Sequence, residues 1–413
     1  MRISRSGVLV SALVLLCLGI VAWATSRATL VDLAVYRAGA AAVLDGRSLY
    51  DAHPPGSFLP FTYPPFAAIA LAPLAWLPQK PAEALFTLAS LLALVRVCAV
   101  LLTASRRDRS GGMRPAQTLV VCVVVALCSE PVARNLAYGQ VNLILMWLVV
   151  EDVLGLGARA PRTQGLLVGI AAGIKLVPAS FALLFLVVGR VRAAVLAGAA
   201  FLATVAAGFL LQPSASHEYW TGLLFDPSRV GDIGAVVNQS LLGLLTRTLP
   251  DGLVRASWIV LALATFALCL TLARWYWRRG LRVVALALVA TAGLLCSPIS
   301  WSHHWVWFVV LLGACGELWS LQRVRVLAAL LVAAPLSWVV WWESLPPSAP
   351  AGPLSFVLVN AYVLVGLAFV GVLWWVRQDV GTRLPETTGS ALDSGKPASV
   401  QPMPGSSDVA GGG

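Results

Sequence analysis

Long apolar runs, separated by short clusters of arginine, limit most strongly what this chain can form. Hydrophobic residues make up 59% of its 413 residues and charged residues only 11%, whereas a soluble domain carries ~25% charge. The runs are continuous and rich in Leu, Ala and Val, unlike the alternating strands of a membrane β-barrel. Because lipid offers no partners to backbone polar groups, such runs predict an all-α polytopic membrane protein.

The arginine clusters predict which ends of the runs face the cytoplasm, because cytoplasmic loops are enriched in Lys and Arg. The clusters lie at 106–114, 159–162, 190–192, 274–282 and 323–325. Placing each of them inside predicts about 12 helical crossings, half-helices included, with both chain ends in the cytoplasm. The net charge of +11 is then explained by loops that face anionic lipid rather than by nucleic-acid binding.

One transmembrane catalytic domain, residues 1–376, is predicted to contain all of these runs. Two long outer regions belong to it, 25–60 and 212–255. Residues 377–413 are rich in Gly, Ser, Pro and Thr, which predicts a disordered cytoplasmic tail.

Three runs have more than one interpretation. The run 7–24 is expected to anchor the N-terminus, although Ala22-Trp23-Ala24 also fits a signal-peptide cleavage site. The proline-rich run 61–77 is expected to remain in the outer loop, because a span there would move the next arginine cluster outside. The run 165–188 has basic residues at both ends, which predicts two half-helices broken near Lys175, but a plain span with a misplaced basic pair also fits.

Polar residues gather in four stretches that this topology places at the outer face, and Tyr63 closes the first outer loop. Lys175 is a separate case, because a charge at membrane depth costs a few kcal/mol and needs a partner or a function. The candidates in the four stretches are Asp32, Tyr36, Arg37, Glu130, Arg134, Asn135, Gln140, Asn142, Asn238, Gln239, Ser240, Trp301, His303 and His304.

Asp32 and Lys175 each fit a structural and a functional interpretation. Asp32 fits a helix N-cap or an ion pair with Arg37 or Arg27, and it also fits a general base that takes a proton from an acceptor hydroxyl. Lys175 fits a side chain that snorkels to the cytoplasmic surface, and it also fits a cation that holds a lipid phosphate.

The other polar stretches are equally open. The amide-rich stretch 130–142 fits a helix–helix turn or contacts with carbohydrate hydroxyls, and 238–240 fits a helix cap or a sugar contact. His303 and His304 are adjacent, so their rings cannot share one helix face, and a histidine bound to phosphate or sugar is favoured over a zinc site. The lack of a phosphate-binding glycine loop or Walker motif argues against a nucleotide-driven pump.

Six stretches, in order, resemble the family 87 glycosyltransferases, the polyprenyl-phosphomannose-dependent α-mannosyltransferases of actinobacteria. The resemblance covers roughly residues 30–310. It implies the GT-C membrane fold, with a catalytic first outer loop and an active site outside the plasma membrane. The nearest functions are those that extend phosphatidylinositol mannosides or lipomannan with α-1,2-mannose. The stretches are DLAVYRAGAAAVLDGRSLYD, FTYPPFAAIALAPLAWLP, EPVARNLAYGQVNLILM, GIKLVP, VNQSLLGLL and SPISWSHHWVW.

The resemblance also implies a mechanism. In the D-x-x-V-Y motif, here Asp32, Val35 and Tyr36, the aspartate is the catalytic base of a single inverting step. The donor is polyprenyl-phosphate-mannose and the acceptor is a mannosylated lipid or glycan. The departing lipid phosphate requires cationic stabilisation, and no metal or cofactor is expected for a monophosphate leaving group. The candidates for this stabilisation are Arg37, Arg134, Lys175 and one of His303 and His304.

Two alternatives remain at this stage. A transporter or flippase of a lipid-linked sugar would share the polytopic form, but it would show pseudo-repeated halves, which the sequence lacks. A transferase that uses a lipid pyrophosphate and a metal would need an acidic pair at the outer face, where only isolated acids are present.

Overall fold

The fold is known from a computed structural model, which describes residues 30–105, 114–342 and 352–384 and five positions of the N-terminal run (12, 15, 16, 19 and 20). The anchor expected at 7–24 therefore lies largely outside the described residues. Regular structure in the described ranges is helical, and one isolated β-bridge joins Asn238 to Trp301.

The helices follow one another with short connections. Up to the middle of the chain they are α2 (Val31–Leu44), α3 (Pro65–Ala70), η1 (Ala72–Leu74), α4 (Gln79–Ala104), α5 (Pro115–Cys128), α6 (Glu130–Tyr138), α7 (Asn142–Val153), α8 (Leu156–Arg159), α9 (Leu166–Ile174), η2 (Val177–Ala179), α10 (Ser180–Val187) and α11 (Val191–Leu211). The remainder are α12 (Pro213–Thr221), η3 (Leu223–Phe225), η4 (Pro227–Val230), α13 (Leu241–Thr248), α14 (Asp251–Trp277), α15 (Arg282–Cys296), η5 (Ser302–Trp307), α16 (Phe308–Glu317), α17 (Gln322–Ser337), η6 (Val339–Trp341), α18 (Pro353–Val359) and α19 (Ala361–Arg383).

Five helical stretches in the described ranges are long and apolar enough to cross a membrane: α4, α11, α14, 322–341 and α19. A sixth is added if α5 and α6, which bend by 70° at their junction, count as one span. The all-helical membrane class is thus confirmed. The count of about 12 crossings, which also includes half-helices and shorter runs, stays a prediction.

Helix α15 lies at the centre of the bundle. Every residue from Val283 to Leu295 is buried, and α15 packs against α10, α14 and α16. A helix that is apolar and buried all round belongs to the interior of a large bundle. By contrast, α14 exposes Val260 and Leu263, which are 65% and 68% exposed. This face of α14 is therefore suited to contact with lipid.

Glycines at every fourth position bring α9 close to α11. A Cβ at Gly169 would lie 2.3 Å from the carbonyl oxygen of Ala197, and one at Gly173 would lie 2.1 Å from Thr204 Oγ1. Small residues at this spacing allow helix backbones to approach closely. The helix ends at Ile174, and Lys175 has an extended backbone (φ −150°, ψ 129°). The predicted interruption of 165–188 thus falls at Lys175.

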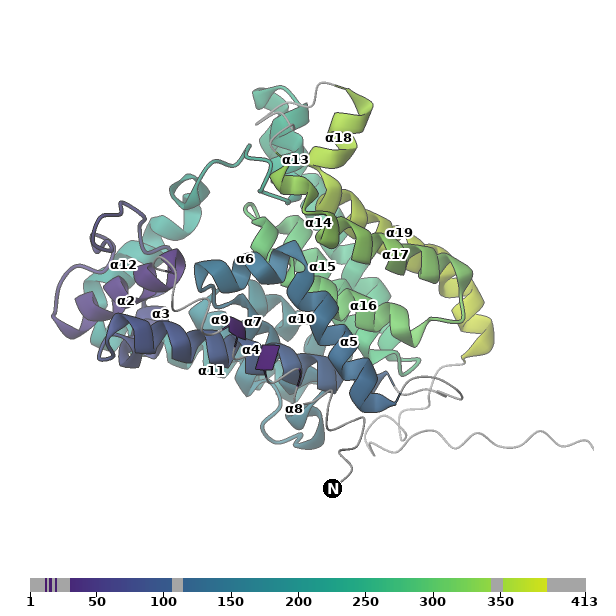
Figure 1. The fold of residues 1–413 in the computed structure, drawn as a ribbon, viewed down its shortest axis with the longest axis horizontal. Helices are drawn as coiled ribbons and strands as arrows, with labels where there is room; N and C mark the ends of the chain where they lie inside the picture. Colours follow the sequence, from purple (N-terminus) through teal and green to yellow (C-terminus); the bar gives the residue numbers. More distant parts are fainter. Residues whose placement is uncertain are drawn as a thin grey trace, which may run out of the picture.

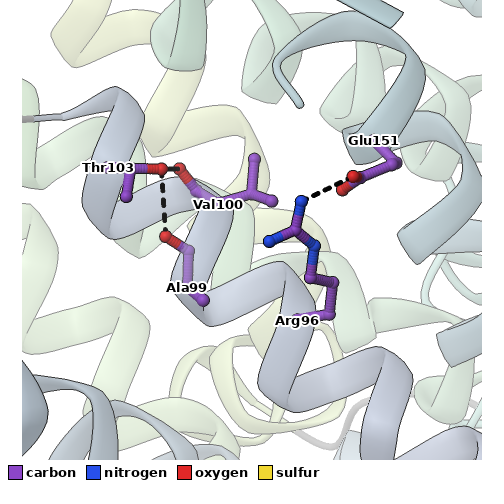
Figure 2. Close-up of polar contacts among 5 residues, drawn as sticks. All are labelled: Arg96, Ala99, Val100, Thr103 and Glu151. Carbon is purple, nitrogen blue, oxygen red and sulfur yellow. Dashed lines mark hydrogen bonds and ion pairs between the residues drawn. The ribbon is translucent and has the colours of Figure 1, made fainter. Parts of the chain in front are cut away.

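Helix α4 carries an arginine within its apolar sequence. Arg96 Nη2 lies 2.6 Å from Glu151 Oε1 on α7, and the carboxylate is almost fully buried (Figure 2). About two turns further along α4, the Thr103 hydroxyl donates to the carbonyl oxygens of Ala99 and Val100. The Arg96 charge and the Thr103 hydroxyl thereby have partners within the protein, as groups in the membrane interior require.

Helices α2, α3 and α12 gather at one end of the molecule, and α17 and α19 lie at the other (Figure 1). Three helices do not follow the boundaries expected from the sequence. The outer loop 25–60 contains the helix Val31–Leu44, α14 begins at Asp251 inside the outer region 212–255, and α19 continues to Arg383, beyond the expected end of the domain at 376. The reason is that a helix extends past its apolar run when its terminal turns are polar and lie at the surface.

Candidate active site

A cavity of about 270 Å³ lies where α2, the break after α9 and the segments 59–64, 219–230 and 297–304 meet. Seven of the predicted site residues line it. They are Asp32, Tyr36, Tyr63, Gln140, Lys175, Trp301 and His304. Helices far apart in the sequence therefore bring most of the predicted polar stretches to one space.

Asp32 enters the cavity from the first turn of α2. The positive end of the helix dipole favours a carboxylate at this position. Tyr36 follows four residues later, which places it on the same helix face. Burial raises the pKa of Asp32 to about 6, while a hydrogen bond with Gln140 and the charge of Lys175 act in the opposite direction. Asp32 is therefore a stronger base than an exposed aspartate and is still mostly ionised at neutral pH.

Gln140 is held by two tyrosines. Its Oε1 accepts hydrogen bonds from the hydroxyls of Tyr36 at 3.0 Å and Tyr63 at 3.2 Å. These two hydroxyl oxygens lie 2.9 Å apart. Both tyrosine hydroxyls donate to Oε1 of Gln140. The NH₂ group of Gln140 is therefore the donor in its hydrogen bond to the Asp32 carboxylate. Gly139 makes the turn before Gln140 possible, since it ends α6 with a φ of 69°, in the left-handed region.

Lys175 enters the same cavity between α9 and η2. Its Nζ donates to Asn142 Oδ1 at 2.8 Å and contacts His304 Nε2 at 3.1 Å. It also lies 5.4 Å from the centre of the Tyr63 ring. No carboxylate in the described part of the chain lies within ion-pair distance of Lys175. Its charge therefore has neutral partners only, which leaves it able to bind an anion.

The adjacent histidines face different surroundings. His304 lines the cavity, whereas the His303 ring packs edge-on against Tyr138, with the ring centres 5.5 Å apart. Burial and the charge of Lys175 hold the pKa of His304 well below its usual range. Because the ammonium group of Lys175 can only donate, Nε2 of the neutral His304 ring is the acceptor and Nδ1 carries the proton. Of the pair, His304 is the one placed to contact a substrate.

Both candidate arginines lie outside the cavity lining. Arg37 donates from Nε to the carbonyl oxygen of Leu74 at 3.1 Å and from Nη2 to that of Leu77 at 2.6 Å, and so ties α2 to the end of η1. The Arg134 guanidinium lies 3.8 Å from the ring centre of Trp341. Of the residues predicted to contact the phosphate, only Lys175 and His304 line the cavity.

Glu130 and Asn135 are fully buried in α6 and lie away from the cavity. The Glu130 carboxylate accepts hydrogen bonds from Ser302 at 2.7 Å, Trp341 at 2.6 Å and Tyr362 at 2.8 Å. The Asn135 amide forms no hydrogen bond with any described residue. Glu130 therefore joins α6 to three segments distant in sequence.

The stretch Asn238, Gln239 and Ser240 is also fully buried and does not line the cavity. Ser240 Oγ accepts from the Gly243 backbone N–H at 3.0 Å, which makes Ser240 the N-cap of α13. The Gln239 amide donates to the Val359 carbonyl oxygen and accepts from the Tyr362 N–H. The contacts match the helix-cap interpretation of this stretch, and none of its three side chains borders the cavity where a sugar could bind.

The second outer region contributes residues that the sequence analysis did not single out, Tyr219, Asp226 and Arg229. Arg229 Nη2 donates to the Phe61 carbonyl oxygen at 2.9 Å. A cation in an outer region departs from the positive-inside rule, and this departure is the signal that could have singled out Arg229. No group of three or more His, Cys, Asp or Glu in the described ranges is arranged to hold a metal ion.

Comparison with known proteins gives the family. A family model for glycosyltransferase family 87 matches residues 61–298, more than half of the chain. This chain belongs to glycosyltransferase family 87. The resemblance first seen in the motifs is thereby confirmed.

Mycobacterial relatives of this family 87 chain carry specific names. A polyprenol-phosphate-mannose-dependent alpha-(1-2)-phosphatidylinositol mannoside mannosyltransferase of Mycobacterium tuberculosis H37Rv is 35% identical, over 79% of this chain and 84% of its own length. Its namesake from Mycolicibacterium smegmatis is 38% identical, over 75% of each chain. A pentamannoside mannosyltransferase of Mycobacterium tuberculosis CDC 1551, also alpha-(1-2), is 37% identical, over 73% of this chain and 71% of its own.

Proposed function

We propose that this chain is an inverting membrane mannosyltransferase. It moves mannose from polyprenyl-phosphate-mannose to a mannosylated phosphatidylinositol or lipomannan and forms an α-1,2 bond. The names of the relatives support the donor, the acceptor class and the linkage. The observation that carries the proposal is one cavity that holds both a half-buried carboxylate, Asp32, and a cation with neutral hydrogen-bond partners, Lys175.

Asp32 is the general base of this reaction. It accepts the proton of the acceptor hydroxyl while the oxygen of that hydroxyl forms a bond to the anomeric carbon of mannose. The bond from that carbon to the phosphate oxygen breaks in the same step, so the β configuration becomes α. The hydrogen bond between Gln140 and Asp32 orients the carboxylate, and Tyr36 and Tyr63 in turn fix the Gln140 amide.

Lys175 and His304 hold the departing lipid phosphate. The phosphate gains negative charge as the glycosidic bond breaks, and a nearby ammonium group in a buried site stabilises that charge strongly. The neutral His304 ring adds an N–H donor. Asn142 keeps Lys175 in place through its 2.8 Å hydrogen bond.

The membrane arrangement follows from the same proposal. The transmembrane domain has the GT-C fold with about 12 crossings in the plasma membrane, and the cavity faces the outside. The reaction uses no metal or other cofactor. The relatives are transferases by name, which favours this function over a flippase of lipid-linked sugar.

The test uses the purified full chain in vesicles with radiolabelled polyprenyl-phosphate-mannose and a phosphatidylinositol mannoside. We expect a labelled glycolipid that an α-1,2-specific mannosidase cleaves, formed equally well with and without EDTA. The Asp32→Asn protein and a reaction without acceptor are the controls. Movement of the labelled donor across the bilayer, without transfer to any mannosylated acceptor, would favour the flippase instead.

A further inference from the structure

The cavity has two ends that differ in exposure. Near Asp32 it is closed, since Tyr36 is 1% and Gln140 5% exposed. At the other end Leu59 is 45% and Val230 38% exposed, so that end opens to the outside. Any hydrophilic substrate that reaches Asp32 from outside passes the residues of the open end.

Three side chains next to the open end have hydrogen-bond donors that are not used within the described part of the chain. The Tyr219 hydroxyl and the Trp301 indole N–H form no hydrogen bond within the described part of the chain. Arg229 donates only its Nη2 group, to the Phe61 carbonyl oxygen. Aromatic faces beside free O–H and N–H donors are suited to a sugar, which presents C–H faces and hydroxyl groups together.

The same three side chains are held firmly in place. Tyr219 stacks on Tyr50 with ring centres 6.1 Å apart, and Arg229 lies 5.3 Å from the Tyr50 ring centre. The Trp301 ring packs against Gly231, where a Cβ would lie 2.9 Å from the indole. Such a surface is ordered before a ligand arrives, which reduces the entropy lost on binding.

Trp301 is also fixed through its backbone. Hydrogen bonds of 2.8 Å on either side of it, from Gln239 N to Ser300 O and from Ser302 N to Val237 O, join its segment to the second outer region. The open end is thus built from two distant stretches of the chain that are locked together.

We propose that Tyr219, Arg229 and Trp301 form a subsite for an acceptor sugar, one residue beyond the mannose whose hydroxyl reacts at Asp32. This inference rests on the proposed transfer reaction. The donor phosphate occupies the other end, at Lys175 and His304. The exposed carboxylate of Asp226 lines the open end beside Arg229, and it disfavours an anion there while it can accept from sugar hydroxyls.

The experiment compares two soluble acceptors, hexyl α-mannoside and an α-linked hexyl dimannoside, with constant donor. The variants are Trp301→Leu and Tyr219→Phe; the second keeps the stacked ring and removes only the free hydroxyl. We expect the KM for the dimannoside to rise about 3- to 10-fold, as for loss of one aromatic or hydrogen-bonding contact. The KM values for the monomannoside and the donor stay unchanged.

Phe225→Leu is the matched control, because Phe225 is an aromatic residue of the same outer region, 74% exposed and outside the cavity lining. It should leave both acceptors unaffected. An equal rise in KM for both acceptors, or a rise in the KM for the donor, would overturn the subsite. If the unmodified protein transfers mannose to neither acceptor nor to a phosphatidylinositol mannoside, the proposed function itself fails.

Discussion

Two buried polar clusters of this protein look alike in sequence and differ in structure. The cavity cluster consists of Asp32, Gln140, Lys175 and His304, and the interior cluster of Glu130, Asn238, Gln239 and Ser240. In the interior cluster the side chains bond to the protein itself, as Glu130 does with three donors. In the cavity cluster, Asp32 and Lys175 border open space. Polar residues in an apolar chain therefore indicate buried polarity, but not how that polarity is used.

The difference has an energetic consequence. A buried polar network with all its partners adds stability and fixes a unique arrangement of the segments it joins. A buried charge without an opposite charge in contact costs stability, as Lys175 does here, and such costs are found at functional sites. Substitutions should therefore impair catalysis in the cavity cluster and stability in the interior cluster.

The largest effect is expected for Asp32→Asn. The amide retains the shape of the side chain but cannot accept a proton from the acceptor. Transfer should fall by about 10³-fold, within the range for loss of a general base, while the thermal unfolding midpoint in detergent stays close to that of the unmodified protein. Initial rates with saturating donor and acceptor provide the measurement. Full turnover by both Asp32→Asn and Asp32→Ala would end the assignment of Asp32 as base.

Lys175→Met should have the next largest effect. It removes the cation that we assign to the leaving phosphate, and kcat should fall about 100-fold, as for loss of one donor to a developing negative charge. Lys175→Arg should restore part of the rate because it keeps the charge. Arg37→Met is the comparison, since Arg37 bonds only to backbone oxygens outside the cavity. An equal loss of kcat in both variants would contradict the assignment.

The sequence predicted more of the cavity cluster than of its surroundings. The family resemblance of the D-x-x-V-Y motif led to Asp32, and Lys175 was singled out because a charge inside an apolar run needs a partner or a function. Side-chain direction was not predictable. Arg37 and Glu130 lie in two other parts of the stretches that resemble the family, yet their partners come from η1 and α19, which only the folded chain brings near.

Helix boundaries and the open end of the cavity show the second limit. The segment Val31–Leu44 was expected to be part of a loop. It contains charged residues and is too short to span a membrane, so its sequence did not stand out as a helix. Tyr219 and Arg229 share no local pattern with Asp32. Only the folded chain, in which α12 packs against α3 and α3 against α2, places them in the same cavity.

Glu130→Leu tests the interior cluster. It leaves the donors of Ser302, Trp341 and Tyr362 without their shared acceptor in a buried site. We expect a loss of about 3 kcal/mol in the free energy of unfolding, within the range for breaking a buried charged contact. The kcat of the protein that remains folded should be close to normal. Lost transfer with unchanged stability would place Glu130 in the catalytic machinery and remove the contrast between the clusters.

Gln140→Leu should have the smallest effect. It distinguishes the two clusters because only a residue of the cavity cluster should change how kcat/KM depends on pH. Asp32 acts when ionised, so kcat/KM of the unmodified protein should rise with pH up to about 6, its raised pKa, and level off above. Gln140 lowers that pKa through its hydrogen bond, so its removal shifts the rise to higher pH. The variant should therefore lose activity several-fold near pH 6 and little at pH 8. Tyr63→Phe, which leaves Tyr36 to hold the Gln140 amide, should shift the profile less and in the same direction. A loss of equal size at every pH would instead give Gln140 the purely structural part that Gln239 has in the interior cluster.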